Sequence, residues 1–210
     1  MTENTNHDIE SGRKLPVMEE FYSLQGEGYN TGEAAYFIRI GGCDVGCRFC
    51  DVKEAWNASL HKPLDIKDVV ERAMQVAAKA VVITGGEPLL YNLNPLCSLL
   101  KRNGIKIFLE TSGSEPFSGE WDWICVSPKA NAETLPVFYN NANELKVIIE
   151  SDTDFARAEK YAEKVTQNCK LYLQPEWSVE KTMTPQIVNY ILQYPKWKIS
   201  LQTHKYINIP

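Results

Sequence analysis

Apolar and polar residues alternate along the chain in two patterns that predict strands and helices. Short apolar runs bounded by turn residues are typical of strands buried on both faces of a sheet. Such runs predict strands at 17–24, 35–40, 80–84, 105–110, 123–127, 145–149, 171–174 and 199–202. Apolar spacings of three and four predict the helices between them: one capped by Asp65 and running through Lys79, one from Asn94 that Gly104 stops, one capped by Asp152, and one opened by Thr184-Pro185.

Strands that alternate with helices predict an α/β fold with a parallel sheet covered by helices. Periodicity alone does not choose between an open doubly wound sheet and a barrel. Several candidate functional residues favour a barrel, because they fall at or just after the carboxyl ends of predicted strands, where barrel active sites lie: Cys43, Gly85, Thr111, Ser127 and Gln174. The chain is too short for eight full units. We therefore expect a partial, TIM-like barrel of parallel strands with a reduced set of helices, and the cysteine-rich loop at the carboxyl edge of the strands.

Length and composition fit one globular domain. The 210 residues suffice for a single well-buried core, which we place at 15–210, after a polar N-terminal tail (1–14) expected to be disordered. A net charge of −5 and the lack of a basic stripe argue against a nucleic-acid partner. The sequence shows neither a membrane-length apolar run nor a signal-peptide pattern, and its scattered cysteines suit a reducing compartment, so we expect a cytoplasmic protein without a membrane partner.

Three cysteines lie close together in the glycine-rich segment 41–51, in the pattern C-x3-C-x2-C: Cys43, Cys47 and Cys50. Thiolates are soft ligands suited to iron–sulfur clusters or zinc. A structural zinc site needs four ligands, whereas three cysteines on a four-iron cluster leave one iron open to another ligand. A zinc site completed by His61 or Cys125 stays as an alternative. The cysteines outside the loop are expected to be core residues: Cys97, Cys125 and Cys169.

This loop, followed by Thr84-Gly85-Gly86-Glu87-Pro88, resembles that of the radical S-adenosylmethionine enzymes. The resemblance implies that the three cysteines hold a [4Fe-4S] cluster and that the open iron binds S-adenosylmethionine. One electron then cleaves this cofactor to a 5′-deoxyadenosyl radical. The resemblance also supports the partial barrel. It places Phe49 near the adenine, and the carboxylate of Glu87 is suited to the amino group of the cofactor.

Further segments resemble one family within this class, the 7-carboxy-7-deazaguanine synthases: Ser23–Gly28, Arg39, Glu110–Gly113, Ser127–Lys129 and Leu173–Glu176. The resemblance runs from about Val17 to Pro210. It implies conversion of 6-carboxy-5,6,7,8-tetrahydropterin to 7-carboxy-7-deazaguanine with loss of ammonia, in the biosynthesis of queuosine and other deazapurines. No catalytic side chain is assigned beyond the cluster and the adenosyl radical.

The resemblance also implies ligand contacts. The implied substrate contacts are Leu24, Gln25, Gly26, Glu27, Arg39, Thr111 and Pro210. The implied cofactor contacts are Phe49, Asp51, Gly85, Gly86, Glu87, Gly113, Ser127, Pro128, Lys129, Gln174, Pro175, Glu176 and Trp177. The chemistry is suitable, because an arginine such as Arg39 can bind a carboxylate with two parallel hydrogen bonds, and Glu27 can accept from a guanidine-like ring edge.

One position departs from the family pattern. Members commonly have Ser or Thr after the Cys-Asp of the loop, where the hydroxyl helps to bind a Mg²⁺ that bridges to the substrate carboxylate; here the residue is Val52. A valine side chain cannot ligate a hard cation, which requires oxygen. We therefore expect weak or no dependence on Mg²⁺, with a side chain or water taking its place.

The resemblance also suggests partners. We expect a homodimer and a flavodoxin or ferredoxin as electron donor. Two other functions are weighed against this one. A glycyl-radical enzyme activase shares the cysteine spacing and the Gly-Gly-Glu-Pro motif, but it acts on a protein and has no reason to carry Gln25-Gly26-Glu27. A non-enzymatic iron–sulfur or zinc module would normally complete four ligands.

Overall fold

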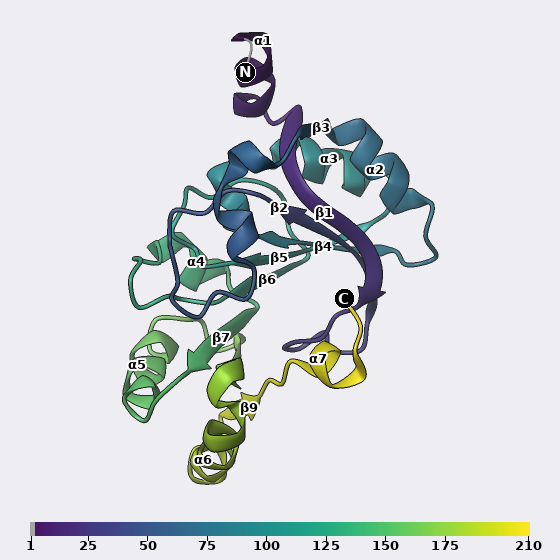
Figure 1. Cartoon of the computed structure of the whole chain (residues 1–210). Helices are drawn as coiled ribbons and strands as arrows, with labels where there is room; N and C mark the ends of the chain where they lie inside the picture. Colours follow the sequence, from purple (N-terminus) through teal and green to yellow (C-terminus); the bar gives the residue numbers. More distant parts are fainter. Residues whose placement is uncertain (1–2) are drawn as a thin grey trace.

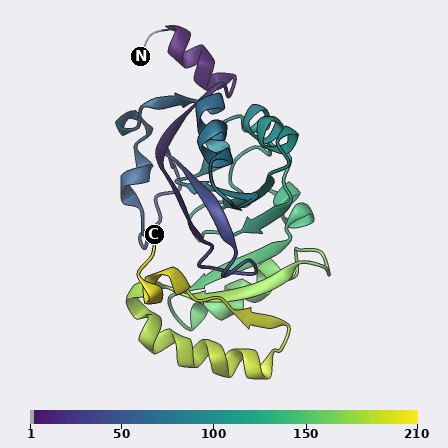
Figure 2. The same cartoon turned by 90° about the vertical axis from the view of Figure 1, so that its right-hand side faces the viewer.

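Nine strands form one continuous, curved sheet in the computed structural model, which describes residues 3–210 (Figures 1 and 2). The sheet order is β3-β1-β2-β4-β5-β6-β7-β8-β9. The strands are β1 (Lys14–Leu24), β2 (Ala34–Ile40), β3 (Pro63–Asp65), β4 (Ala80–Gly85), β5 (Lys106–Thr111), β6 (Trp123–Val126), β7 (Glu144–Ile149), β8 (Lys170–Pro175) and β9 (Trp197–Ile199). From β2 through β9 the neighbours are parallel. The sheet does not close, which confirms the expected partial barrel.

The strand β1 and its neighbour β3 break the parallel pattern. β1 pairs antiparallel with both β2 and β3. The apolar run at 17–24 predicts a strand correctly, but strand direction cannot be read from periodicity. The short β3 was not predicted.

Most helices cover one face of the sheet, whereas the N-terminal helix projects away from it (Figures 1 and 2). The helices are α1 (Glu3–Glu10), α2 (Ile66–Met74), α3 (Asn94–Arg102), α4 (Pro136–Asn141), α5 (Thr153–Ala162), α6 (Glu180–Gln193) and α7 (Thr203–Ile207), with 3₁₀ turns at Lys53–Trp56, Ala58–Leu60, Pro88–Leu90 and Trp177–Val179. Apolar side chains of α2 through α6 pack on alternate strand residues to form the main core. The short α7 lies instead at the end of β1, beside the C-terminus (Figure 1).

Both faces of the central strands are apolar, which explains their unbroken apolar runs. In β4, Val81 and Ile83 belong to the main core, whereas Val82 packs on the opposite face with Phe37 and Phe108. The hydrophobic effect therefore fixes these strands from two sides. Polar side chains on the inner face lie mainly toward the carboxyl ends of the strands, although β7 carries Glu144 at its start and Lys146 two residues later.

The expected disordered tail is wrong for the described part of segment 1–14. Residues 3–10 form α1, and β1 begins at Lys14. Asp8 holds the turn between them, because its carboxylate binds Arg13 at 2.7 Å and Lys14 at 2.9 Å. Gly12 takes a φ of 71°, a left-handed conformation that glycine adopts readily. Residues 1 and 2 of that prediction lie outside the described residues.

The helix boundaries were predicted less well than the helices themselves. Asp65 caps α2 as expected, accepting from the Lys67 amide at 2.9 Å, but the helix ends at Met74 rather than Lys79. Asp152 makes no capping bond; Asp154 instead accepts from the amides of Glu150 and Ser151.

Two predicted elements near the C-terminus are shifted. The helix expected to open at Thr184-Pro185 begins at Glu180, so Pro185 lies inside α6. The strand expected at 199–202 is Trp197–Ile199. Residues after it leave the sheet, because Ser200 and Gln202 turn their side chains to polar partners in the site described next.

Candidate active site

A cavity of about 450 Å³ lies on the inner face of the sheet, at the carboxyl ends of the parallel strands. The loop that follows β2, the turn after β4 and the ends of β5, β7 and β8 form its wall, and the C-terminal segment borders it. Most residues predicted for the site line it: Leu24, Gln25, Gly26, Glu27, Arg39, Cys43, Cys47, Phe49, Cys50, Asp51, Gly85, Gly86, Glu87, Thr111, Ser127, Lys129, Gln174, Pro175, Glu176, Trp177 and Pro210. Gly113 and Pro128 do not line it.

The backbone of the cysteine loop is held by the turn after β4. The Gly86 amide donates to the Ile40 carbonyl and the Glu87 amide donates to the Gly42 carbonyl, both at 2.8 Å. The approach is so close that a β-carbon on Gly86 would lie 2.1 Å from the Gly42 oxygen. Glycine is therefore required here for the loop to reach the turn.

The three loop cysteines fit an iron–sulfur cluster. All are free, half-buried thiols that face one cavity. Burial raises the pKa of Cys43 and Cys47, although the charge of Lys129 counteracts this at Cys47. Trp56 donates its indole N–H to the Cys50 sulfur at 3.3 Å, the kind of contact that tunes a ligating thiolate.

The alternative of a single zinc ion lacks a fourth ligand. His61 lies outside the cavity lining, with its Nε2 2.9 Å from the Glu54 carbonyl oxygen. Cys125 is buried in β6, where burial raises its pKa strongly. Across residues 3–210, no three His, Cys, Asp or Glu side chains group around one point that could hold a metal ion. Separate thiolates around a cluster fit this arrangement better than a mononuclear site.

Glu87 has a different set of partners from those expected. Its side chain is 1% exposed, and its carboxylate accepts four hydrogen bonds. Thr111 and the Leu89 amide donate to Oε1, while the amide and the hydroxyl of Ser112 donate to Oε2. These donors use the acceptor positions of a carboxylate. Glu87 therefore joins the Gly-Gly turn to the end of β5.

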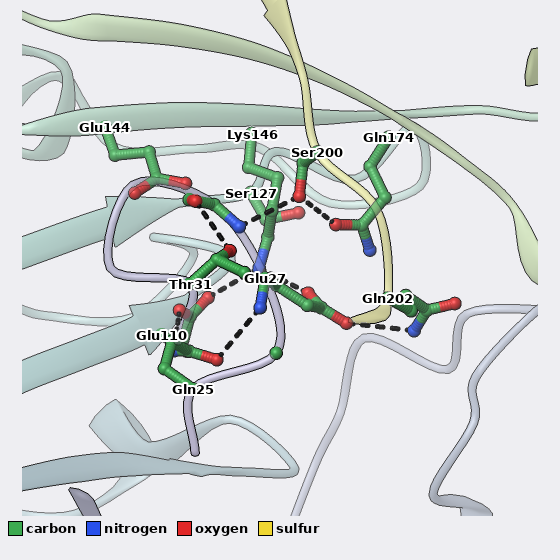
Figure 3. Close-up of polar contacts among 12 residues, drawn as sticks. Gln25, Glu27, Thr31, Glu110, Ser127, Glu144, Lys146, Gln174, Ser200 and Gln202 are labelled. Atoms are coloured by element: carbon green, nitrogen blue, oxygen red, sulfur yellow. Dashed lines mark hydrogen bonds and ion pairs between the residues drawn. The ribbon is translucent and has the colours of Figure 1, made fainter. Parts of the chain in front are cut away.

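A buried lysine forms the centre of a charged network on the opposite wall (Figure 3). Lys146, on β7, is 5% exposed. Its Nζ lies 2.6 Å from Glu27 Oε2 and 2.9 Å from Glu110 Oε2. Gln25 donates to the other oxygen of Glu110 at 3.2 Å. The network thus joins the segment after β1 to the inner faces of β5 and β7.

The same network sets the charge of Glu27. Burial alone would raise the pKa of Glu27, but the ion pair with Lys146 and the hydrogen bond from Gln202 lower it to about 2. Three neighbouring glutamates keep the pKa of Lys146 well above its ordinary value despite burial. At neutral pH the cavity therefore presents an ionised carboxylate at Glu27.

Glu144 lies behind this network. Its Oε2 accepts from the Tyr29 amide and the Trp123 indole, each at 3.1 Å. Burial and the charge of Glu110 raise the pKa of Glu144 to about 7. These contacts hold the segment after Gly28 against the sheet.

The C-terminal segment closes the network on the side of the cysteine loop. Gln202 donates through one nitrogen to Glu27 Oε1 and to Asp51 Oδ2, each at 2.9 Å. Lys205, on α7, donates to the same Asp51 oxygen at 2.6 Å and to Gln202 Oε1 at 3.0 Å. Polar bonds therefore run from the cysteine loop through α7 to β5.

Arg39 has donors to spare in the cavity. Its Nε lies 2.8 Å from Glu19 Oε1, but the two atoms are not aligned for a hydrogen bond. This Nε has no other partner among residues 3–210. Its guanidinium carbon lies 5.5 Å from the centroid of the Phe21 ring. The side chain is thus positioned by an ion pair and an aromatic face.

The ends of β6 and β8 bring further predicted residues to the cavity. Lys129 donates to the Ser127 hydroxyl at 2.6 Å, and burial lowers the pKa of Lys129. Gln174 accepts from Ser200 at 2.7 Å, and Ser200 in turn accepts from the Gly28 amide at 2.9 Å. The segment around Gly28 is therefore joined to β8 as well as to β7.

Sequence reasoning missed several charged and polar lining residues: Glu110, Lys146, Gln202, His204 and Lys205. A signal existed for two of them. Glu110 and Lys146 are charged residues inside otherwise apolar strand runs, where an ion is costly unless it is paired. No comparable signal marked Lys205, because a lysine in a polar terminal segment is most often a surface residue.

Known proteins of similar sequence and structure agree with these features. The family model of the Radical SAM superfamily matches residues 37–167. The 7-carboxy-7-deazaguanine synthase of Flavobacterium psychrophilum is 53% identical over 210 residues, which cover all of both chains. That of Synechocystis is 48% identical over 92% of this chain and 93% of its own. The crystal structure of QueE from Escherichia coli matches with a TM-score of 0.82 and 32% identity over 97% of this chain and 99% of that chain.

The open barrel and its three-cysteine loop define a radical S-adenosylmethionine enzyme, a class whose cofactors are a [4Fe-4S] cluster and S-adenosylmethionine. Within that class the identities over nearly full length are decisive. The chain belongs to the 7-carboxy-7-deazaguanine synthase family. This membership makes it a lyase and excludes the glycyl-radical activase and the non-enzymatic module.

Proposed function

We propose that the protein converts 6-carboxy-5,6,7,8-tetrahydropterin to 7-carboxy-7-deazaguanine and ammonia. The observation that supports this most directly is the content of one cavity. It holds the three free cysteines and, from another wall, an ionised carboxylate buried beside Lys146. Such a cavity suits a small heterocycle with a guanidine-like edge next to an iron–sulfur cluster. The deazaguanine product would enter the queuosine pathway.

The cysteine side of the cavity would hold the cofactors. Cys43, Cys47 and Cys50 would ligate the cluster, and the backbone around Gly85 and Gly86 would contact S-adenosylmethionine. When bound, the pair supplies a 5′-deoxyadenosyl radical that removes a hydrogen atom from carbon 6 of the pterin. Because four donors already bind the Glu87 carboxylate, we propose that Glu87 positions Thr111 and Ser112 and does not bind the cofactor directly.

The remaining predicted cofactor contacts surround the same space. Lys129 and Gln174 line the cavity with polar groups, and Trp177 lines it with an indole ring. Glu176 accepts from the Ser178 amide at 3.0 Å, which fixes the turn that carries Trp177. We propose that these residues enclose the adenosine part of the cofactor and exclude water from it.

The network around Lys146 would bind the substrate. Glu27 remains ionised far below neutral pH, so its carboxylate can accept N–H groups from the amino-pyrimidinone edge of the pterin. Gln25 is held by Glu110, which fixes the direction in which its amide faces. The free donors of Arg39 suit an anionic or carbonyl oxygen of the same ligand. Pro210 lines the cavity beside this wall.

The test is an anaerobic reaction of the reconstituted protein with dithionite, S-adenosylmethionine and the carboxylated tetrahydropterin, with products identified by mass. We expect 7-carboxy-7-deazaguanine and ammonia. A Cys47→Ser variant should give neither, whereas a Cys169→Ser variant, changed in the core, should keep the activity. If 5′-deoxyadenosine forms without the deazaguanine, the proposed substrate is wrong.

Three expectations on partners and location stay predictions: a homodimer, a flavodoxin or ferredoxin as electron donor, and a cytoplasmic location. No helix within residues 3–210 is long and apolar enough to cross a membrane.

A further inference from the structure

The cavity does not fit a divalent cation beside the cysteine loop. Val52 lines the cavity at the position where the family resemblance implies an oxygen ligand, and its side chain has none. One oxygen of the neighbouring carboxylate is already occupied, because Asp51 Oδ2 accepts from both Lys205 and Gln202. A Mg²⁺ ion bound by this oxygen would have to displace the Lys205 ammonium from it.

The ammonium group at this position is well placed to act as a cation itself. Lys205 lines the cavity, and its side chain is 21% exposed. Its Nζ lies 4.7 Å from the centroid of the Trp177 ring, an aromatic face that attracts a positive charge. An ammonium has three donors, of which Asp51 and Gln202 use two. One donor is left for a ligand.

The two other lysines of the cavity are committed elsewhere, and Arg39, which keeps free donors, lies on a different strand. Lys146 is buried between two carboxylates, and Lys129 donates to Ser127 on the wall formed by β6. Arg39 lies on β2 beside Phe21 and Glu19. Among the lysines that line the cavity, Lys205 alone lies on the C-terminal helix against the residue that precedes Val52.

We propose that the Lys205 ammonium binds the substrate carboxylate beside the cysteine loop, in the place of a divalent metal ion. This inference rests on the proposed function, because it assumes a carboxylated pterin as ligand. Lys205 is then a residue that determines specificity for the carboxylate. Asp51 and Gln202 position it by accepting two of its three N–H groups.

Equilibrium dialysis tests this with two ligands that differ only in the carboxylate. Protein that contains the cluster and S-adenosylmethionine is dialysed anaerobically against 6-carboxypterin or against pterin, in the presence of a chelator. We expect the wild type to prefer 6-carboxypterin. Lys205→Met should weaken binding of 6-carboxypterin about tenfold, the size of one charge-assisted hydrogen bond, and should leave pterin binding nearly unchanged.

Matched variants separate charge from folding. Lys205→Arg should keep the preference for 6-carboxypterin, whereas Lys205→Gln should lose it as Lys205→Met does. Lys198→Met, at an exposed lysine of β9, should behave as the wild type. The double variant Val52→Thr with Lys205→Met restores a hydroxyl ligand, so Mg²⁺ should strengthen its binding of 6-carboxypterin but not of pterin.

Three results would overturn the proposal. The first is an unchanged preference in Lys205→Met. The second is wild-type binding of 6-carboxypterin that Mg²⁺ strengthens severalfold. The third is a loss of the preference in Arg39→Met alone, which would assign the carboxylate to Arg39. Failure of the wild type to bind either pterin would instead refute the proposed substrate, and with it this inference.

Discussion

Removal of the Lys146 ammonium should destabilise the protein strongly and in a pH-dependent way. Lys146→Met keeps the length and apolar stem of the side chain but leaves two carboxylates without their cation. The side chains of Glu27 and Glu110 are only 19% and 21% exposed, so water cannot fully replace the lysine. Loss of one member of a buried ion pair typically costs about 3–5 kcal/mol.

The lowered pKa of Glu27, which reflects the same ion pair, corresponds to a stabilisation of similar size. The folded protein lowers it from 4.5 to about 2, and each unit corresponds to about 1.4 kcal/mol, so the ionised form is favoured by roughly 3 kcal/mol. This stabilisation is present above pH 4.5 and is lost as the pH falls toward 2. In Lys146→Met burial acts unopposed, so the pKa of Glu27 should rise above 4.5. Acidification then relieves a buried charge in the variant.

The assay is thermal unfolding of the anaerobically reconstituted protein, followed by circular dichroism at several pH values. A loss of 3–5 kcal/mol should lower the midpoint by roughly 10 °C in a chain of this size at about pH 8. The gap between variant and wild type should narrow toward about pH 5, because the carboxylates of the variant become protonated first. Lys106→Met, at an exposed lysine of β5, serves as the control. The reasoning is refuted if the gap is independent of pH, or no larger than that of the control.

Two further substitutions probe the cofactor side of the cavity. Glu87→Gln should lower the thermal midpoint by a few degrees and weaken S-adenosylmethionine binding, because the Ser112 amide then faces an NH₂ group and loses its acceptor at about 1–3 kcal/mol. Unchanged affinity in equilibrium dialysis would contradict the assigned role. Gly86→Ala should lower the iron content after reconstitution, since its β-carbon would lie 2.1 Å from the Gly42 oxygen and displace the cysteine loop; a full complement of iron by colorimetric assay would show that the loop tolerates the shift.

Much of the sheet could be predicted from the sequence because both of its faces are buried. Strands such as β4 and β7 appear as unbroken apolar runs, and the strand ends that carry Gly85 and Thr111 were placed correctly. Strand direction cannot be read from an apolar run, so the antiparallel direction of β1 was not predicted. The helix α1 was missed because polar contacts of Asp8 define its end, and such contacts leave no hydrophobic period.

The cavity was predicted as a set of motifs, but the bonds among them were not. The position of Glu27 beside a lysine depends on β7, whose Lys146 lies 119 residues away in the sequence. The partners of Glu87 could not be predicted for a similar reason, because its donors come from the Leu89 amide, the end of β5 and the residue after it. Spacing identifies which residue types gather at a strand edge; it does not say which partners each side chain already has.

The backbone bonds between the cysteine loop and the turn after β4 bear on how the metal centre is assembled. Backbone hydrogen bonds within the chain hold Gly42 and the start of the loop, and these bonds do not involve iron. A zinc finger becomes ordered only when it binds metal. The start of this loop instead becomes ordered, and loses its conformational entropy, when the sheet folds. In the apoprotein the start of the loop should therefore already be in place, so that cluster insertion rearranges only the segment around the three cysteines at the rim of a folded barrel.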